Sequence, residues 1–295
     1  MPHRRTLPLL ALVLVACSAD PGVSVQRADE LVATTTVEPT TTVDETVPTD
    51  TGDGVGDVLF PDLGNPGIDV QHYAVDLTYD PDSGELTGDV TLDLKLTQDR
   101  DQITLDSKGP EVQTVMVDGA PATFENDDPE LRIDLPEGLG AGDPAQVIGA
   151  YTVNPKVIAS EVGVQDGWIA TENGSYVLNE PEGARTWLPC NDHPSDKATW
   201  TFRITVPDGV VAVANGELTG LDDTDDEDTY TWDESDPMAT YLIQVLTGDY
   251  VIVNGQGPHG LPLTSVVFAD DREAAQPALD LIDDQIAFFE DYFGP

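Results

Sequence analysis

From about residue 66 onward, apolar and polar side chains alternate along the chain, and this period of two restricts the fold more than any other feature. The first alternating stretch carries Tyr73, Val75, Leu77 and Tyr79. The turn-rich segment 80–84 comes next, and the alternation then resumes. A period of two places every second side chain on one face of a strand, so the pattern predicts two half-buried strands joined by a hairpin.

The alternation returns in short stretches separated by Gly, Pro and Asp. The expected strands lie at 90–96, 103–105, 115–117, 131–135, 147–153, 200–206, 230–232, 241–246 and 251–253. Many short strands with such turns indicate a mainly β fold, an antiparallel β-sandwich or saddle-shaped sheet, over residues 66–258.

One long helix is expected near the C-terminal end. Residues 270–273 have the pattern of a capping box, and Pro277 in a first turn is the alternative start. Apolar side chains then recur at helical spacing, at Ile282, Ile286, Phe289 and Phe293. Because such a stripe needs a large apolar partner and the sequence stops after it, we expect the chain to be a fragment.

The charge balance argues against whole classes of partner. The sequence has 12 Lys and Arg residues and 56 Asp and Glu residues, which gives a formal net charge of −44. Capture of nucleic acid, or adhesion of the protein face to an anionic membrane, needs a basic surface. The negative charge is typical of a protein that stays soluble in a salty medium. The alternative is that the charge steers cationic substrates toward the protein. The acidic run 222–228 lacks the glycine and final glutamate of an EF-hand loop, so a solvated hairpin tip is preferred over a calcium site.

The first 17 residues have the features of a targeting signal. Arg4 and Arg5 precede the apolar run 7–15, which is too short to span a bilayer and is typical of a signal peptide. Residues 14–17, Leu-Val-Ala-Cys, resemble a bacterial lipobox. The resemblance implies that Cys17 carries a lipid and anchors the protein outside the cytoplasm, whereas an ordinary cleavage site that contains a cysteine is the alternative.

Residues 18–65 differ in composition from the alternating region. They are rich in Thr, Asp, Pro and Gly and predict a disordered tether. With Cys17 lipidated, Cys190 has no partner for a disulfide and is expected to be a small buried side chain.

Residues 180–200 hold the densest motif, EPEGARTWLPCNDHPSDKATW. This segment closely resembles the signature near the end of the N-terminal domain of aminopeptidase N-like zinc peptidases, the gluzincin aminopeptidases. The resemblance extends over about residues 66–295. The matching positions are Glu180, Ala184, Arg185, Pro189, Cys190, Asp192, Pro194, Lys197, Ala198 and Thr199.

The resemblance implies a role for Glu180, which in that family helps to bind the free α-amine of the substrate. A fixed carboxylate suits a terminal ammonium through a charge-assisted hydrogen bond. An exposed glutamate before a proline is the alternative. Arg185 is expected to brace a carboxylate, and Asp192 and Lys197 to order the loop.

The family's chemistry depends on H-E-x-x-H, in which two histidines bind Zn²⁺ and the glutamate activates water. The sequence contains no such pattern. We therefore expect Zn²⁺ in a full-length enzyme, with no metal ligand and no catalytic residue in this chain. Residues 259–295 would begin a truncated thermolysin-like α/β domain.

The cluster of Asp192, His193, Ser195 and Asp196 suggests a catalytic triad or a metal site. Triad members are rarely sequence neighbours, and a metal site needs three or four converging ligands, so a polar loop is the preferred interpretation. An unrelated hydrolase that uses this cluster is a further alternative.

Two functions compete. The first is the front part of a secreted, membrane-anchored zinc aminopeptidase that acts on extracellular peptides. The second is a surface-anchored β-sandwich that serves as a binding or scaffold module without catalysis. The expected partners are peptide substrates and, through Cys17, the membrane.

Overall fold

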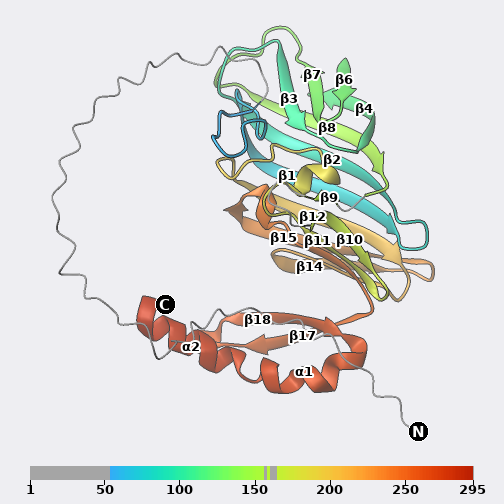
Figure 1. Ribbon diagram of the computed structural model, residues 1–295, viewed down its shortest axis with the longest axis vertical. Helices are drawn as coiled ribbons and strands as arrows, with labels where there is room; N and C mark the ends of the chain where they lie inside the picture. Colours follow the sequence, from blue (N-terminus) through green and yellow to red (C-terminus); the bar gives the residue numbers. More distant parts are fainter. Residues whose placement is uncertain (1–53, 156–157, 160–164, 295) are drawn as a thin grey trace, which may run out of the picture. The chain divides into compact units, whose positions relative to one another are not determined.

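The computed structural model describes residues 54–155, 158–159 and 165–294 (Figure 1). The predicted signal peptide, Cys17 and most of the predicted tether lie outside these residues. No helix within the described ranges is long and apolar enough to cross a membrane.

An eight-stranded sheet forms the largest layer, in the order β14-β15-β12-β1-β2-β8-β4-β5 (Figure 1). Its strands are β1 (Ile68–Asp80), β2 (Glu85–Leu96), β4 (Glu111–Val117), β5 (Ala120–Pro121), β8 (Pro144–Val153), β12 (Ala198–Pro207), β14 (Glu217–Asp223) and β15 (Glu227–Met238). The expected hairpin of β1 and β2 is confirmed, with Tyr73 opposite Leu92. Neighbouring strands run antiparallel except for β1 and β12, which are parallel with His72 opposite Thr199.

Two shorter sheets accompany the large one. A three-stranded sheet has the order β3-β7-β6, and a five-stranded sheet has the order β13-β16-β11-β10-β9. Their strands are β3 (Gln102–Asp106), β6 (Phe124–Asp127), β7 (Glu130–Asp134), β9 (Ile158–Ala159), β10 (Gln165–Thr171), β11 (Gly174–Leu178), β13 (Val211–Ala214) and β16 (Val245–Gly248). The mainly β fold class expected from the alternation is therefore confirmed.

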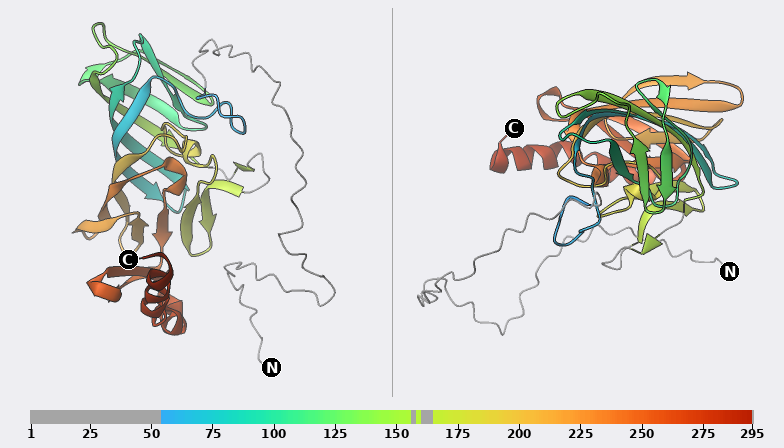
Figure 2. Two further views of the ribbon diagram at one scale, coloured as in Figure 1. Left: turned by 90° about the vertical axis from the view of Figure 1, so that its left-hand side faces the viewer. Right: turned by 90° about the horizontal axis from the view of Figure 1, so that it is seen from above.

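The core lies between the large sheet and the two shorter ones (Figure 2). The alternating side chains of β1 and β2 are buried there, as their period predicts. Aromatic rings join the layers: Tyr79 of β1 contacts Trp168 of β10 at a centroid distance of 4.9 Å, and Trp168 contacts Trp187 at 5.7 Å. The segment that carries the signature motif is thus packed into the same core as the sheets.

The structure corrects one expected strand. The alternation predicts an extended segment at residues 241–246, but Thr240–Leu242 form a 3-10 turn and β16 begins only at Val245. The physical reason lies outside the local pattern, because the buried Thr240 hydroxyl donates a hydrogen bond to Asp192 at 2.6 Å. The acidic run is a hairpin tip, as preferred, with Asp223 of β14 opposite Asp228 of β15.

The expected C-terminal helix is divided in two. Strands β17 (Tyr250–Gln256) and β18 (Pro262–Phe268) form a hairpin, and α1 (Arg272–Leu279) and α2 (Ile282–Phe293) come after it (Figure 1). The capping box is not formed, because Asp271 stands at the N-cap without a side-chain hydrogen bond, and Pro277 lies inside α1. Within the stripe of α2 the two phenylalanines are exposed, Phe289 at 56% and Phe293 at 83% of their surface, whereas Ile282 and Ile286 are half-buried.

The end of the predicted tether lies against the domain. Leu63 is buried, and the Asn65 backbone N–H donates to the Asn191 side-chain oxygen at 2.6 Å. The Gly64 backbone N–H donates to Asp106 at 3.3 Å. Composition alone assigns residues 54–65 to the tether, but these long-range bonds hold its last residues on the signature loop.

Replacement of Trp200 tests the aromatic part of the core. Trp200 is fully buried and lies parallel to Tyr73, with ring centroids 4.0 Å apart, while its indole N–H donates to the Met238 carbonyl. We expect Trp200→Ala to lower the free energy of unfolding by about 3–5 kcal/mol in urea denaturation.

Trp200→Phe, which keeps a ring but loses the indole donor, should cost less. Leu221→Ala on the edge strand β14, where Leu221 is half exposed, should stay within about 0.5 kcal/mol of the unchanged protein. Equal losses for Trp200→Ala and Leu221→Ala would contradict the assignment of Trp200 to the core.

Candidate functional site: the signature loop

Glu180 stands just beyond the end of β11, at the start of the signature loop. Its side chain is exposed, and no hydrogen bond or ion pair joins its carboxylate to another described residue. The bond to Pro181 is cis, and the chain turns back so that the Gly183 backbone N–H donates to the Asn179 carbonyl at 2.9 Å. The carboxylate of Glu180 therefore projects from a closed turn toward solvent.

Buried charged side chains support this turn. Arg185 and Glu182 form an ion pair in which both side chains are almost fully buried. The Arg185 backbone N–H donates to Asp192 at 3.1 Å, and the Thr240 hydroxyl donates to the other oxygen of the same carboxylate. Burial raises the pKa of Asp192, and these two hydrogen bonds oppose the rise.

A second buried carboxylate, Asp106 at the end of β3, supports the loop from below. It accepts hydrogen bonds from the Asp192 backbone N–H at 2.8 Å and from the Asn65 side chain at 2.9 Å. Burial, and then the nearby charge of Asp192, raise the pKa of Asp106 to about 7. The sequence offered no signal for Asp106, since a lone aspartate after a short strand has no distinguishing pattern.

Cys190 pairs with Asp106 through the backbone, with the Asp106 N–H donating to the Cys190 carbonyl at 2.8 Å and the Cys190 N–H donating back at 3.0 Å. The thiol is buried, as expected, and burial raises its pKa well above the ordinary value. Pro189 is buried beside it, whereas Pro194 and Lys197 are exposed.

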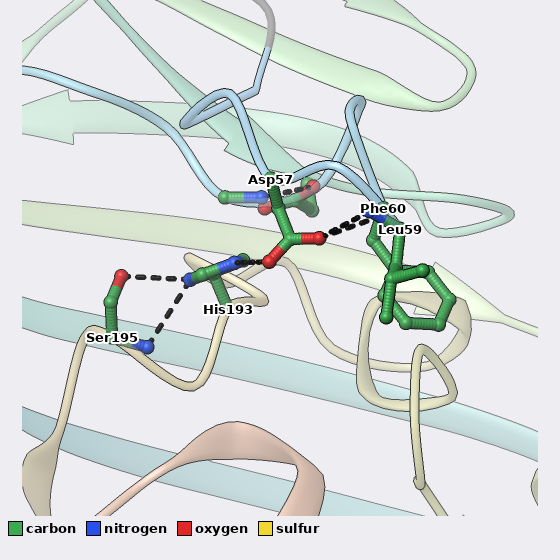
Figure 3. Close-up of polar contacts among 7 residues, drawn as sticks. Asp57, Leu59, Phe60, His193 and Ser195 are labelled. Atoms are coloured by element: carbon green, nitrogen blue, oxygen red, sulfur yellow. Dashed lines mark hydrogen bonds and ion pairs between the residues drawn. The ribbon is translucent and has the colours of Figure 1, made fainter. Parts of the chain in front are cut away.

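His193 lies between two partners, Ser195 and Asp57, in an arrangement that resembles a triad (Figure 3). Its Nδ1 lies 2.7 Å from the Ser195 hydroxyl, and its Nε2 lies 3.6 Å from an Asp57 carboxylate oxygen. The Ser195 backbone N–H also donates to Nδ1, at 3.2 Å, so the imidazole closes a local turn. Asp57 in turn accepts hydrogen bonds from the Leu59 and Phe60 backbone N–H groups, which lower its pKa.

In the suspected cluster, His193 and Ser195 bond each other, whereas the two carboxylates bond residues outside the cluster. Asp192 bonds Thr240 and Arg185, while Asp196 accepts from the Val70 backbone N–H and from Asn191. Neither carboxylate bonds His193. The loop is therefore held by several separate hydrogen bonds, and its charged groups do not converge on one reacting atom.

The described residues do not fit a zinc site. No three His, Cys, Asp or Glu side chains within those ranges converge so that they could hold a metal ion. The acceptors nearest to the signature motif, Asp106 and Asp192, are already bonded to backbone and hydroxyl donors.

Asp106→Asn tests the buried carboxyl. The folded-state pKa of about 7 lies above the ordinary value of 3.8, so the folded state holds this proton more tightly than the unfolded state does. The resulting stability is complete below about pH 4 and is lost as the pH rises through about 7. We expect the free energy of unfolding in urea to fall over this range by at most about 4 kcal/mol, and to fall less in Asp106→Asn.

The matched control is Asp208→Asn, which changes an exposed carboxylate in the turn after β12. It should keep the pH dependence of the unchanged protein. If Asp106→Asn showed the same slope as this control, the titration of Asp106 would not contribute to stability.

Comparison with known proteins identifies the family of this chain. The profile of the Peptidase M1 N-terminal domain matches residues 69–242. A probable aminopeptidase 1 of Sulfurisphaera tokodaii is 25% identical over 193 residues, which are 62% of this chain and 22% of the relative. An aminopeptidase N of Acetobacter pasteurianus is 26% identical over 231 residues, 75% of this chain and 64% of the relative. The chain thus spans less than two thirds of either relative.

A solved structure gives the same assignment. A mutant of the M1 zinc metallopeptidase from Deinococcus radiodurans, bound to a Tyr-Ser-Ala substrate, superposes with a TM-score of 0.71 and 30% sequence identity. The match covers 82% of this chain and 57% of that one. The sandwich, the signature loop and the extent of these matches agree, and the chain belongs to the M1 peptidase family through its N-terminal domain.

Proposed function

We propose that this chain is the N-terminal part of a zinc aminopeptidase and that Glu180 binds the α-amine of a peptide substrate. The observation that supports the proposal most strongly is the exposed, unpartnered carboxylate of Glu180 on a closed turn, within a domain of the M1 family. A carboxylate held in place can form charge-assisted hydrogen bonds to a substrate ammonium without first breaking an internal ion pair.

The neighbouring charges favour this role for Glu180 over the other acids of the loop. Glu182 is paired with Arg185, and Asp192 is buried with both oxygens bonded. Glu180 is thus the acid of this turn whose charge remains open to a ligand. The substrate class is a peptide with a free N-terminus, in keeping with the peptide bound to the Deinococcus radiodurans relative.

The proposed enzyme acts outside the cytoplasm, held by a lipid on Cys17. This part of the proposal depends on the N-terminal sequence, with its basic start, its apolar run and the lipobox-like residues 14–17. The Thr- and Pro-rich segment after Cys17 would let the domain reach extracellular peptides. Zn²⁺ would be supplied by a zinc-binding domain, where it activates water for peptide hydrolysis.

The competing function is a surface-anchored binding module without catalysis. It predicts that the reading frame downstream of residue 295 encodes no H-E-x-x-H motif, whereas the enzyme predicts one. Sequencing the gene beyond this point separates the two.

For this chain expressed alone, we expect no hydrolysis of an aminoacyl p-nitroanilide and no stoichiometric zinc after dialysis, because its sequence has no H-E-x-x-H. Zinc is measured by mass spectrometry of the purified protein. Turnover that a chelator abolishes would overturn the assignment of catalysis to another domain.

Glu180→Ala tests the amine contact in a polypeptide that joins this chain to the zinc-binding domain. Loss of a charge-assisted hydrogen bond should raise the Michaelis constant for aminoacyl anilides at least about tenfold. Glu172→Ala, which removes an exposed glutamate from the β10–β11 turn, should leave it unchanged. An unchanged Michaelis constant in Glu180→Ala would exclude the proposed contact.

A further inference from the structure

We propose that Asn179 is a positioning residue that fixes Glu180 for the substrate amine, an inference that rests on the function proposed above. Asn179 precedes Glu180 in the chain and is 2% exposed. The two residues continue the alternation of β11, in which Ser175 and Val177 are buried and Tyr176 and Leu178 are exposed. The inward side chain is therefore in a position to hold the outward one.

The carboxamide of Asn179 is bonded at both ends to segments distant in the fold. Its oxygen accepts the indole N–H of Trp187 at 3.0 Å, and its nitrogen donates to the Ile243 carbonyl at 2.8 Å. Trp187 is fully buried in the core, and Ile243 directly follows the turn that Thr240 ties to Asp192. A buried amide satisfied in this way has a single orientation, because a flipped amide would place like groups against each other.

The backbone of Asn179 is held as firmly as its side chain. Its carbonyl accepts the Gly183 N–H, which closes the turn around Glu180. Gly183 is so crowded that an added Cβ would lie 2.5 Å from the Leu178 carbonyl oxygen and 2.8 Å from the Asn179 Cα. The turn is thus packed closely against the backbone of Asn179, and the direction in which Glu180 leaves the sheet is set at this contact.

Only a side chain with a donor and an acceptor at this length fits both partners. Aspartate has the same shape and still accepts from Trp187, but it cannot donate and would set a charge against the Ile243 carbonyl. Asn179→Asp therefore disturbs one bond while it keeps the volume of the side chain.

The chain offers a control in Asn215, a less buried asparagine directly after β13 that bonds the backbone of the same turn. Its nitrogen donates to the Leu242 carbonyl at 3.2 Å, and its oxygen accepts the Gln244 N–H at 2.6 Å. Asn215→Asp perturbs this turn in the same chemical way, but Asn215 is not adjacent to Glu180 in the chain.

The experiment measures kcat and the Michaelis constant for an aminoacyl p-nitroanilide in a polypeptide that joins this chain to the zinc-binding domain. We expect Asn179→Asp to raise the Michaelis constant about three- to tenfold with a smaller change in kcat, and Asn215→Asp to leave it unchanged. In a Glu180→Ala background, Asn179→Asp should have no further effect, because it acts through Glu180.

Trp187→Phe is the second variant, in case Asn179→Asp does not fold. It removes the indole donor to Asn179 and keeps an aromatic ring. It should raise the Michaelis constant when Glu180 is present and have no effect in Glu180→Ala. Near-ultraviolet circular dichroism and the melting temperature report whether each variant is folded.

Three results would overturn the inference. They are an unchanged Michaelis constant in folded Asn179→Asp and Trp187→Phe, an equal rise in Asn215→Asp, and a rise that persists when Glu180 is alanine. Failure of the proposed function looks different, because the Michaelis constant would then be unchanged in Glu180→Ala itself.

Discussion

The hydrogen bonding of two buried carboxylates, Asp106 and Asp192, is the constraint on which the signature loop depends. Each is removed from water, and a buried charge is costly unless donors surround it. The donors come from widely separated segments: Asn65 before β1, Arg185 within the loop and Thr240 before β16. Any rearrangement of the loop would leave a carboxylate unpaired, so the loop, the entering chain and the turn at 240 hold one another in place.

The local pattern of the sequence predicts most long strands of the large sheet, but it misses strands such as β10, β11 and β13 and does not predict which strands pair. The alternation from Tyr73 to Tyr79 is a direct consequence of one buried face, and it appears in β1 as expected. The parallel pairing of β1 with β12 has no local signature, since it joins residues 127 apart, as at His72 and Thr199. The turn at Thr240 was missed for a similar reason, because its cause is a carboxylate 48 residues away.

The candidate site divides in the same way. Glu180, Arg185 and Asp192 stand out in the sequence because they share one dense motif, and the structure brings them into one loop. Three further residues support the loop although they lie outside that motif: Asn65, Asp106 and Asn179. Their importance depends on hydrogen bonds that only the folded chain forms, such as the contact of Asn179 with Ile243.

The parallel pairing of β1 and β12 also has a consequence for the order of folding. On a growing chain, β1 and β2 can pair as a hairpin as soon as both have been made, since their contacts are local. The other edge of β1 must wait until residues near Trp200 have been synthesised, and until then it presents unpaired backbone groups. Closing so long a loop is slow compared with forming a hairpin. The middle of the large sheet is therefore completed late, and the signature loop, which lies between these two strands in sequence, takes its final shape in the same step.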